Sequence, residues 1–443
     1  MSNYKTVIEE LRKAGFSSYL VGGCVRDTLL GKEPQDYDVA TSALPEQVKE
    51  ALCAYHVIDT GLKHGTVTVV IDHEPFEVTT FRIDKDYTDG RHPDSVQFTD
   101  DLTKDLSRRD FTVNAMAMDE NGNVIDPFGG REDLEKGIIR AVGDPKKRFE
   151  EDALRILRAL RFASCLGFVI EKETANAALE MKERLALISR ERCYAELKKT
   201  LCGQSIEKIL IEYWEIFAAV IPQLEPMRFY DQNNPHHLYT LDKHTAVAVA
   251  NTPASPAVRF AALLHDTGKP HVRTTDEDGV SHYYGHGEVS REIAEKVMTD
   301  LRSEKRTKDK VCFLVEHHDE PVEKTEKAVQ RRIGKYGYEN YRDLLLLRRA
   351  DRLATGTSLE KLDLYDSALA MAEETERKKN SLSLATLKID GNDLIAMGCR
   401  EGKSIGLLLS KLLDAVSEGR CSNEKNALSK LAEKMIKENA EEK

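Results

Sequence analysis

The chain has 443 residues, more than one small domain usually contains, and this length indicates two to four folded units. Hydrophobic residues make up 41% and charged residues 32% of the sequence, a composition that excludes a disordered chain and favours a soluble globular one. The net charge of −11 argues against a nucleic-acid-binding surface over the whole protein, because binding phosphate groups needs basic residues.

The N-terminal residues 1–15 predict a charged amphipathic helix and lack the apolar segment of a secretory signal. No run of about 18 apolar residues occurs, so no membrane-spanning helix is expected. The eight cysteines form no C-x-x-C pair, and reduced thiols in a cytoplasmic protein are the simplest account.

The next stretch predicts a strand, a glycine turn and a short helix. An apolar, β-favouring run at 19–21 precedes Gly22 and Gly23, which allow a tight turn with close approach of the backbone. From Val25 the spacing becomes helical, with Arg26 on the polar side. Backbone N–H groups at such a turn can hold phosphate oxygens.

Two acidic residues follow on a second predicted strand. Asp36 and Asp38 are two residues apart, so on a strand they point to the same face. Paired carboxylates repel each other unless a cation lies between them, and Mg²⁺ favours such oxygen ligands together with phosphate oxygens. The pattern indicates metal-assisted phosphoryl transfer. A plain turn followed by a solvated strand end is the alternative, but the two motifs together within about 20 residues favour the functional interpretation.

The GG-x-VRD and D-x-D motifs resemble the signature of the bacterial tRNA CCA-adding nucleotidyltransferases and their relatives, the bacterial poly(A) polymerases (class II). The similarity continues through RRDFTVNA at 108–115 and through Glu151-Asp152-x-x-Arg155. It implies template-independent addition of CCA to the 3′ end of tRNA from CTP and ATP. It also implies Mg²⁺ on Asp36 and Asp38 as the catalytic pair. The residues expected to bind the nucleotide are Gly23, Arg26, Arg109, Asp110, Asp152, Arg155, Arg158 and Arg161.

Residues 55–81 predict three strands in a hairpin or meander. If the last strand neighbours the one that carries Asp38, Glu77 becomes a third acidic residue of the metal site, although an exposed glutamate without a ligand role is commoner. Residues 82–96 are rich in Asp, Gly and Pro and predict a mobile loop. In the resembled family, a loop here is present in enzymes that add the terminal A and shortened in those that add only CC. This one is full length.

Beyond a short acidic helix, the RRDFTVNA segment is expected to enter a strand at 111–118, and residues 123–145 to form a strand, a turn and a strand that close the head. Arg109 can bridge triphosphate oxygens, because a guanidinium binds phosphate groups bidentately. Asp110 can accept a hydrogen bond from a ribose hydroxyl.

From Lys146 the apolar residues follow helical spacing, and the predicted buried face comprises Phe149, Ala153, Ile156, Leu157, Leu160 and Ala163. The opposite face carries Asp152, Arg155, Arg158 and Arg161. Residues 146–200 contain 13 Lys and Arg against 9 Asp and Glu, which indicates either an RNA-facing stripe or a solvated, ion-paired face.

Asp152 and Arg155 are suited to nucleobase selection. Cytosine and adenine each present an amino donor beside a ring-nitrogen acceptor, whereas uracil and guanine present a carbonyl beside a ring N–H. A carboxylate that accepts from the amino group and a guanidinium that donates to the ring nitrogen therefore favour C and A. The protein would then select its nucleotide without a nucleic-acid template.

A second chemical cluster comprises His244, the pair His265-Asp266 in LLHDTGKP, and Asp351. Imidazoles and carboxylates from separate helices are suitable ligands for Mg²⁺, Mn²⁺, Ni²⁺ or Co²⁺. The pattern resembles the HD phosphohydrolase superfamily, and all four of its ligand positions are filled. A plausible substrate is a 2′,3′-cyclic or terminal phosphate on damaged RNA, and a general nucleotidase is nearly as good an account.

Two further histidines, His286 and His317, lie where some HD proteins recruit additional ligands. This indication is weak, because histidine is frequent in the region, which also contains His271, His282 and His318.

The predicted fold is α+β, with an N-terminal α/β head followed by a mainly helical neck, body, HD domain and tail. The expected units are the nucleotidyltransferase head (1–145), the neck and body (146–230), the HD domain (231–360) and the tail (361–443). The tail resembles the tRNA-gripping tail of the CCA-adding family, although an ordinary helical hairpin would look much the same.

The alternative functions are a poly(A) polymerase, or an HD phosphohydrolase with a nucleotide- or RNA-sensing head. The sequence leaves the oligomeric state open.

Overall fold

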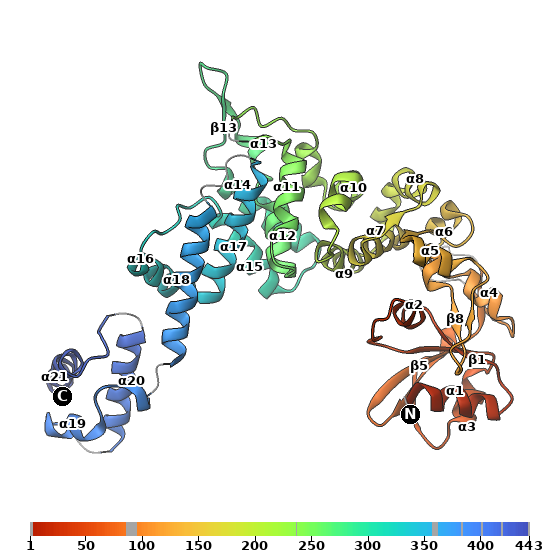
Figure 1. Ribbon diagram of the computed structural model, residues 1–443, viewed down its shortest axis with the longest axis horizontal. Helices are drawn as coiled ribbons and strands as arrows, with labels where there is room; N and C mark the ends of the chain where they lie inside the picture. The colour runs from red at the N-terminus through yellow and green to blue at the C-terminus, as the bar shows by residue number, and fades with distance from the viewer. Residues whose placement is uncertain are drawn as a thin grey trace.

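The chain forms an arch in the computed structural model, which describes residues 3–85, 95–235, 237–356, 362–381, 384–399, 402–417 and 420–441. A head containing a β-sheet lies at one end of the arch, and a small helical unit carrying the C-terminus lies at the other (Figure 1). Helices make up most of the body between them. This arrangement confirms the predicted α+β class.

The head is built on a seven-stranded sheet of order β3-β4-β5-β2-β1-β8-β9. Its strands are β1 (Ser18–Val21), β2 (Asp38–Thr41), β3 (His56–Gly61), β4 (Thr66–Ile71), β5 (Glu74–Thr80), β8 (Ala117–Met118) and β9 (Val124–Ile125). The helices of the head's first half are α1 (Asn3–Lys13), α2 (Gly23–Leu29) and α3 (Pro45–Ala51). Val7, Ile8 and Leu11 of α1 are fully buried, so burial of this apolar face attaches the helix to the sheet.

The strands β3, β4 and β5 confirm the predicted meander. Asp72 and His73 both have positive φ, 49° and 68°, as the two-residue turn between β4 and β5 requires. The strand β5 then runs parallel to β2, with Glu77 level with Asp38. The strand carrying Glu77 is therefore the neighbour of the one carrying Asp38, which is the condition that the sequence left open.

The segment predicted as a loop at 82–96 is partly a hairpin. The strands β6 (Arg82–Lys85) and β7 (Ser95–Phe98) pair in antiparallel fashion, so the flanks of the segment are strands. Residues 86–94 lie outside the described residues.

The predicted strand at 111–118 is wrong for most of its length. Residues Thr112–Asn114 form a 3₁₀ turn (η2), because Thr112 donates its N–H to the Arg140 carbonyl and its hydroxyl to Asp133. These partners lie further along the chain, and strand periodicity does not reveal them. The head also contains α4 (Leu102–Ser107), α5 (Gly130–Lys136), where a turn was expected, and β10 (Ile138–Ile139).

The apolar face predicted from Lys146 onwards is confirmed, because all six of its residues are buried. The helical spacing continues across residues 146–163, but the structure divides this stretch into two helices. Helix α6 (Pro145–Glu151) ends before Asp152, whose backbone is extended, and α7 (Leu154–Leu166) begins after it. The neck and body continue through β11 (Val169–Ile170), α8 (Lys172–Glu180), η3 (Lys182–Leu187), α9 (Arg190–Leu201), α10 (Ile206–Val220) and η4 (Pro222–Met227).

Helix α9 joins the neck to the region that follows. On one side, Tyr194 donates its hydroxyl to Glu304 at 2.6 Å and Lys198 binds the same carboxylate at 3.1 Å. Tyr194 also stacks on Phe260, with ring centroids 5.6 Å apart. The neck therefore packs directly on the histidine-rich region.

The histidine-rich region is helical apart from one short two-stranded ribbon, in agreement with the prediction of a mainly helical HD domain. The ribbon pairs β12 (Thr274–Thr275) with β13 (Ser281–His282). The helices are α11 (Leu241–Ala250), α12 (Pro256–Leu264), α13 (Lys269–Val272), α14 (His286–Asp300), α15 (Lys305–His317), α16 (Glu326–Tyr336) and α17 (Tyr338–Ala354).

The tail has a hydrophobic core of its own, centred on Leu394, Leu412 and Leu428. Its elements are η6 (Leu384–Thr386), α19 (Gly391–Ala396), α20 (Lys403–Ser417) and α21 (Lys425–Glu441), which follow the long α18 (Leu362–Ser381). Across the described ranges, every helix is too short or too polar to traverse a lipid bilayer.

An ion pair between a half-buried arginine and a buried carboxylate fixes the head to the neck. The Arg158 guanidinium of α7 lies 2.6 Å from Asp110, and Asn114 donates to the same carboxylate at 3.1 Å. Burial alone would raise the pKa of Asp110, but the charge of Arg158 and the Asn114 hydrogen bond outweigh burial and lower that pKa to about 2. The carboxylate is therefore charged at neutral pH and depends on Arg158.

Replacing Arg158 with Gln should lower the free energy of unfolding by about 2 kcal/mol at pH 7, because Asp110 stays buried without its cation. The contribution of Asp110 is present above the ordinary aspartate pKa and disappears as the pH falls towards 2. The difference between wild type and Arg158→Gln in urea unfolding should therefore shrink from pH 7 to pH 3.

As a control, Lys146→Gln removes an exposed pair with Glu180 and should leave the urea unfolding curve unchanged at both pH values. An Arg158→Gln effect that does not change with pH would contradict the ion-pair account.

Gly130 allows α5 to lie against the 3₁₀ turn. A Cβ at this position would be 2.3 Å from the Thr112 carbonyl oxygen, a backbone atom that cannot turn away. Gly130→Ala should therefore destabilise the head by about 1–3 kcal/mol. The matched variant Gly334→Ala, inside α16 with nothing within 4 Å, should stabilise the protein by about 0.5–1 kcal/mol. Thermal unfolding that ranked the two variants the other way round would disprove this packing argument.

Candidate functional site

The glycine turn after β1 brings a cation and a carboxylate together. Gly22 has a φ of 77°, and a Cβ there would be 3.0 Å from Arg109 Nη1 and 3.8 Å from Asp38 Oδ2. A side chain at this position would therefore occupy the space that the guanidinium and the carboxylate approach. The turn, the start of β2 and the RRD segment meet at one place, as the sequence motifs implied.

Three carboxylates gather at the start of β2. The strand begins at Asp38, so Asp36 lies in the bend before it and is exposed, and the prediction that both side chains lie on one strand was only half right. Burial raises the pKa of Asp38, and the Glu77 and Asp36 carboxylates raise it further, against the opposing charge of Arg109. A cation bound here would relieve this repulsion, so the donor set fits a divalent metal.

The described part of the head contains no group of three potential ligand atoms within 4.8 Å of one another. The carboxylates of Asp36, Asp38 and Glu77 therefore lie further apart than the ligand atoms of the histidine-rich region do.

Arg26 and two arginines of α7 surround one aromatic ring. The guanidinium carbons of Arg26, Arg158 and Arg161 lie 5.2, 5.3 and 4.1 Å from the centre of the Phe162 ring. Arg26 also donates to Asn114 Oδ1 at 2.7 Å. Each ring–cation contact stabilises its arginine by roughly 0.5–2 kcal/mol. The sequence did not indicate Phe162, which looks like an ordinary residue of a helix.

Asp152 and Arg155, the predicted pair for base selection, already have partners. Asp152 accepts from Arg192 of α9 at 2.8 Å and from the Leu154 N–H, so it also caps α7. Arg155 donates to Glu151 at 2.7 Å and to the Arg108 carbonyl at 2.9 Å. Among the hydrogen bonds and ion pairs of the described residues, none joins these two side chains.

Sequence reasoning missed the contribution of α9 to this region. Besides Arg192, the helix provides Glu196, which binds Arg161 at 2.6 Å and lies 3.8 Å from Arg158. A glutamate on the predicted buried side of an amphipathic helix was the signal available in the sequence. Only the packing of α9 on α7 identifies the arginines that bind it.

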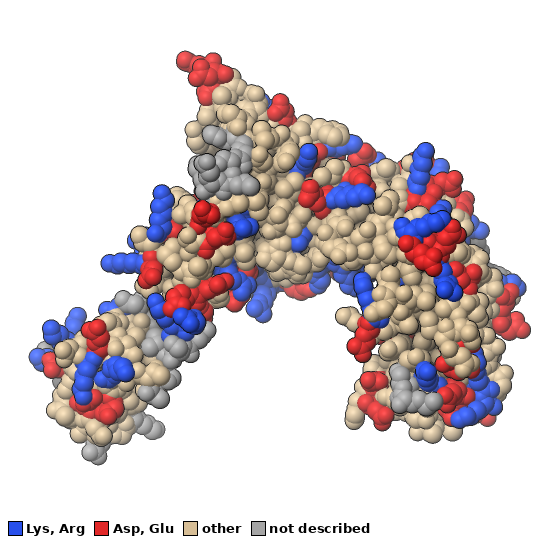
Figure 2. Space-filling model, in the orientation of Figure 1, with Lys and Arg blue, Asp and Glu red and all other residues tan. Residues whose placement is uncertain are grey.

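The predicted basic stripe at 146–200 is largely ion-paired. Lys146 binds Glu180, Arg148 binds Glu151, and Lys182 binds Glu215. Figure 2 shows Lys and Arg interspersed with Asp and Glu over the visible face of the arch. This favours the ion-paired face over a continuous RNA-facing stripe.

The four residues of the predicted HD set converge. His244 Nε2 lies 2.9 Å from Asp351 and 3.4 Å from Asp266, and His265 Nε2 lies 3.2 Å from Asp266. Their ligand atoms all fall within 4.8 Å of one another. Burial lowers the pKa of His265, but the charges of Asp266 and Asp351 outweigh it and raise that pKa to about 10. The site therefore attracts positive charge.

The histidines are oriented for metal binding. The Nδ1 atoms of His244 and His265 donate to the backbone carbonyls of Ala354 and Ala262, which can only accept, so each ring turns Nε2 towards the carboxylates. Among the described residues, neither Nε2 atom makes a well-aligned hydrogen bond, although both are buried and lie within 3.5 Å of carboxylate oxygens. Buried imidazole nitrogens that face two carboxylates without a well-aligned hydrogen bond fit a divalent metal.

A second ligand group shares Asp266 with the first. His286 Nε2 lies 3.3 Å and His318 Nε2 lies 3.6 Å from Asp266 Oδ1, and the two rings also orient through Nδ1 bonds to the carbonyls of Tyr283 and Val315. One carboxylate thus faces two sets of imidazoles, which is an arrangement that suits two neighbouring cations.

His318, rather than His317, belongs to this second group. His317 binds Glu320 at 3.0 Å and stacks on Tyr336, so it points away from the ligands. Adjacent residues at a helix end face different directions, and the sequence alone did not decide between the two.

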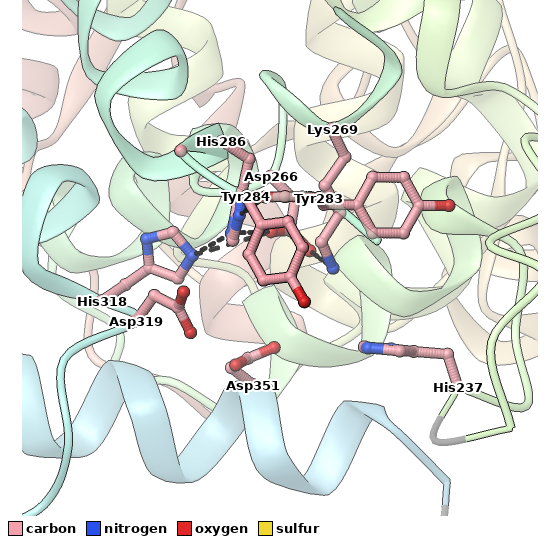
Figure 3. Close-up of a pocket in the computed structure, with 10 residues that line it drawn as sticks. His237, Asp266, Lys269, Tyr283, Tyr284, His286, His318, Asp319 and Asp351 are labelled. Carbon is pink, nitrogen blue, oxygen red and sulfur yellow. Dashed lines mark hydrogen bonds and ion pairs between the residues drawn. The ribbon is translucent and has the colours of Figure 1, made fainter. Parts of the chain in front are cut away.

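The ligand groups open into a pocket lined by His237, Asp266, Lys269, Tyr283, Tyr284, Gly285, His286, His318, Asp319 and Asp351. Figure 3 shows Lys269 reaching Asp266, at an Nζ–Oδ2 distance of 2.7 Å. Lys269 also donates to the buried Gln232 of the link that precedes α11. A lysine here gives the pocket a cation for an anionic ligand.

Three family models match separate parts of the chain. The poly A polymerase head domain matches residues 18–140, the probable RNA and SrmB-binding site of polymerase A matches residues 167–227, and the HD domain matches residues 242–356.

Curated relatives are named CCA-adding enzyme. The protein of Leuconostoc mesenteroides is 50% identical over 204 residues, which are 46% of this chain and 50% of that relative, so the match spans about half of its length. The protein of Ligilactobacillus salivarius is 33% identical over 444 residues, covering 98% of this chain and 96% of the relative.

Solved structures of CCA-adding enzymes share the fold. The Bacillus stearothermophilus enzyme in complex with CTP has a TM-score of 0.64 and 29% identity, covering 99% of this chain and 98% of that one. The Thermotoga maritima enzyme complexed with tRNA has a TM-score of 0.55 and 22% identity, a likeness of fold alone. Similarity along nearly the whole length of the Ligilactobacillus relative shows that this chain, a nucleotidyltransferase with an HD domain, belongs to the family of CCA-adding enzymes.

Proposed function

We propose that the protein adds C, C and A without a template to the 3′ end of tRNA, using CTP and ATP. The observation that carries this proposal is the meeting of the Gly22 turn, Arg109 and Asp38 at the start of β2, with Glu77 level with Asp38 on the next strand. Phosphate-binding and metal-binding groups are thereby adjacent, as transfer of a nucleotidyl group requires.

Each residue of the proposed head site has a separate role. Gly23, Arg26 and Arg109 bind the triphosphate, whose charge guanidinium groups balance. Asp36 and Asp38 would hold Mg²⁺, which when bound supplies charge stabilisation for the attacking hydroxyl and the leaving pyrophosphate. Glu77 adds a further negative charge beside Asp38.

Base selection is assigned to Asp152 and Arg155. Both now bind protein partners, Arg192 and Glu151, so a nucleobase must replace these contacts. Such an exchange costs little when the entering base returns the same number of hydrogen bonds, and uracil or guanine would leave the groups unsatisfied. Arg158 and Arg161, held by Asp110 and Glu196 on the Phe162 ring, complete the nucleotide site.

The other units of the chain are proposed to bind tRNA and to catalyse a second reaction. We assign residues 1–145 to the head, 146–230 to the neck and body, 231–360 to the HD domain and 361–443 to a tRNA-binding tail. The space between the two ends of the arch lies beside both the head and the tail (Figure 1), so one elongated RNA can touch both.

The HD domain is proposed to hydrolyse a phosphate ester, with a 2′,3′-cyclic or terminal phosphate of damaged RNA as the favoured substrate. His244, His265, Asp266 and Asp351 would hold one divalent metal, and Asp266, His286 and His318 a second. Bound metal supplies an activated water for attack on phosphorus. Lys269 is placed to bind a phosphate oxygen, and removal of the phosphate leaves the 3′ hydroxyl that the head needs. The imidazoles favour Mn²⁺, Co²⁺ or Ni²⁺, whereas the head carboxylates favour Mg²⁺.

CTP alone separates CCA addition from the rival poly(A) polymerase function. With Mg²⁺ and tRNA lacking CCA, the protein should add two C residues from CTP and then one A when ATP follows, as gel analysis resolves. Asp38→Ala should lower the rate about 10³-fold through loss of metal binding, whereas Glu46→Ala, an exposed carboxylate on α3, should have no effect. Tails made of A alone would support a poly(A) polymerase, and absence of CMP incorporation would disprove the proposal.

The HD reaction should be separable from nucleotide addition. The variant His265→Ala with Asp266→Ala should lose metal-dependent hydrolysis of adenosine 2′,3′-cyclic phosphate, because both residues belong to the ligand set, and should retain CMP addition within about twofold. His317→Ala, outside both ligand groups, is the control and should keep both activities. Hydrolysis that survives the double variant would refute the assignment, and loss of both activities would show that the domain supports the fold.

A further inference from the structure

The pocket at the HD ligands is small for a whole nucleotide. Its volume is about 290 Å³, at the lower end of the roughly 300–1,000 Å³ that small-molecule sites occupy. Asp266, His286, His318 and Asp351 line it, so a phosphate ester bound to metals held by these residues would occupy part of this volume. The base of a nucleotide substrate must therefore lie at the mouth of the pocket.

Tyr284 lies at that mouth. Its side chain is 79% exposed, although it also lines the pocket. Figure 3 shows the ring in front of the ligand groups, between the His318 and His237 side chains in this view. A large ring face is thus open to solvent beside the site.

The Tyr284 ring is held in place rather than free on the surface. It stacks on the His282 ring at a centroid distance of 5.5 Å and an interplanar angle of 7°. His282 Nε2 in turn binds Asp276 at 2.7 Å, across the β12–β13 ribbon. A single exposed tyrosine is common on protein surfaces. Tyr284 differs because a stacked histidine orients its ring beside a candidate phosphate-binding pocket, where a nucleobase could stack on it.

We propose that Tyr284 stacks on the nucleobase of the HD substrate, which makes the site selective for phosphate esters of nucleosides over simple phosphate esters. The nucleoside is either free or the last residue of an RNA. This inference rests on the proposed phosphohydrolase function and names the substrate class of that site.

The test compares adenosine 3′-phosphate with glycerol 2-phosphate, which lacks a base, using the full chain and each of Mg²⁺, Mn²⁺, Co²⁺ and Ni²⁺. Tyr284→Ala should raise KM for adenosine 3′-phosphate about tenfold, leave kcat within about twofold and leave glycerol 2-phosphate kinetics unchanged. Tyr284→Phe should behave as wild type. The control Phe229→Ala removes an aromatic ring that is 72% exposed and does not line the pocket, and it should change nothing.

Equal effects of Tyr284→Ala on both substrates, or none, would overturn the stacking role and leave the phosphohydrolase function standing. If wild type hydrolyses neither substrate, the phosphohydrolase function fails, and saturation-transfer NMR with adenosine 3′-phosphate decides the stacking question. If the signals of the base protons are weaker with Tyr284→Ala than with wild type or Tyr284→Phe, the stacking role is supported, and equal signals in all three proteins refute it. Because the head is identical in the three proteins, nucleotide bound there contributes the same signal to each. A lower KM for tRNA ending in a 3′-phosphate would identify the RNA end, rather than the free nucleotide, as the source.

Discussion

The ion pair between Asp110 and Arg158 determines how the two halves of the nucleotide site face each other. Asp110 belongs to the same segment as Arg109, which lies against the glycine turn, and Arg158 belongs to the helix that Asp152 caps. The carboxylate is buried and its other oxygen accepts from the Phe111 N–H and from Asn114. A rotation of the head against the neck would break the Arg158 ion pair, whereas the Phe111 and Asn114 bonds lie within the head and hold the carboxylate in place. The relative positions of the proposed phosphate-binding and base-reading groups therefore depend on this ion pair, together with the bond from Arg155 to the Arg108 carbonyl.

The HD ligands depend on a different constraint, the fixed orientation of imidazole rings by backbone carbonyls. His265 and His318 each donate to the carbonyl three residues earlier, so the end of a helix both places and orients the ring. Such a site is preorganised, because the rings need not turn when the metal binds. The two candidate sites thus differ in kind: spaced carboxylates in the head, and packed imidazoles with carboxylates in the HD domain.

Local motifs were predicted well because their signals are local. The strand, turn and helix around Gly22 and the ligand set around His265 and Asp266 follow from residues that are neighbours in the chain or fill a known pattern. The strand expected at 111–118 failed because Thr112 bonds to residues about 20 to 30 positions away, and propensity contains no such information.

The site residues that sequence reasoning missed have the same origin. Arg192 and Glu196 matter only because α9 packs on α7, and Phe162 only because three guanidinium groups converge on it. The break at Asp152 has a local cause, since its side chain caps α7, but the apolar spacing continues across it and conceals it. Periodicity reports which face is buried, and it does not report where a helix stops or what it touches.

Helix α9 acts as a strut between the two candidate sites. Residues Arg192 and Glu196 lie one turn apart on the side that meets α7, while Tyr194 and Lys198 lie one turn apart on the side that holds Glu304. Glu304 directly precedes α15, and His318 directly follows it. Because helices are stiff, any axial displacement of α9 would be passed through Glu304 to α15 and so to His318 at its far end. The two sites are thus joined through α9 and α15, helices of about 18 and 20 Å in length, and share no ligand among the described residues.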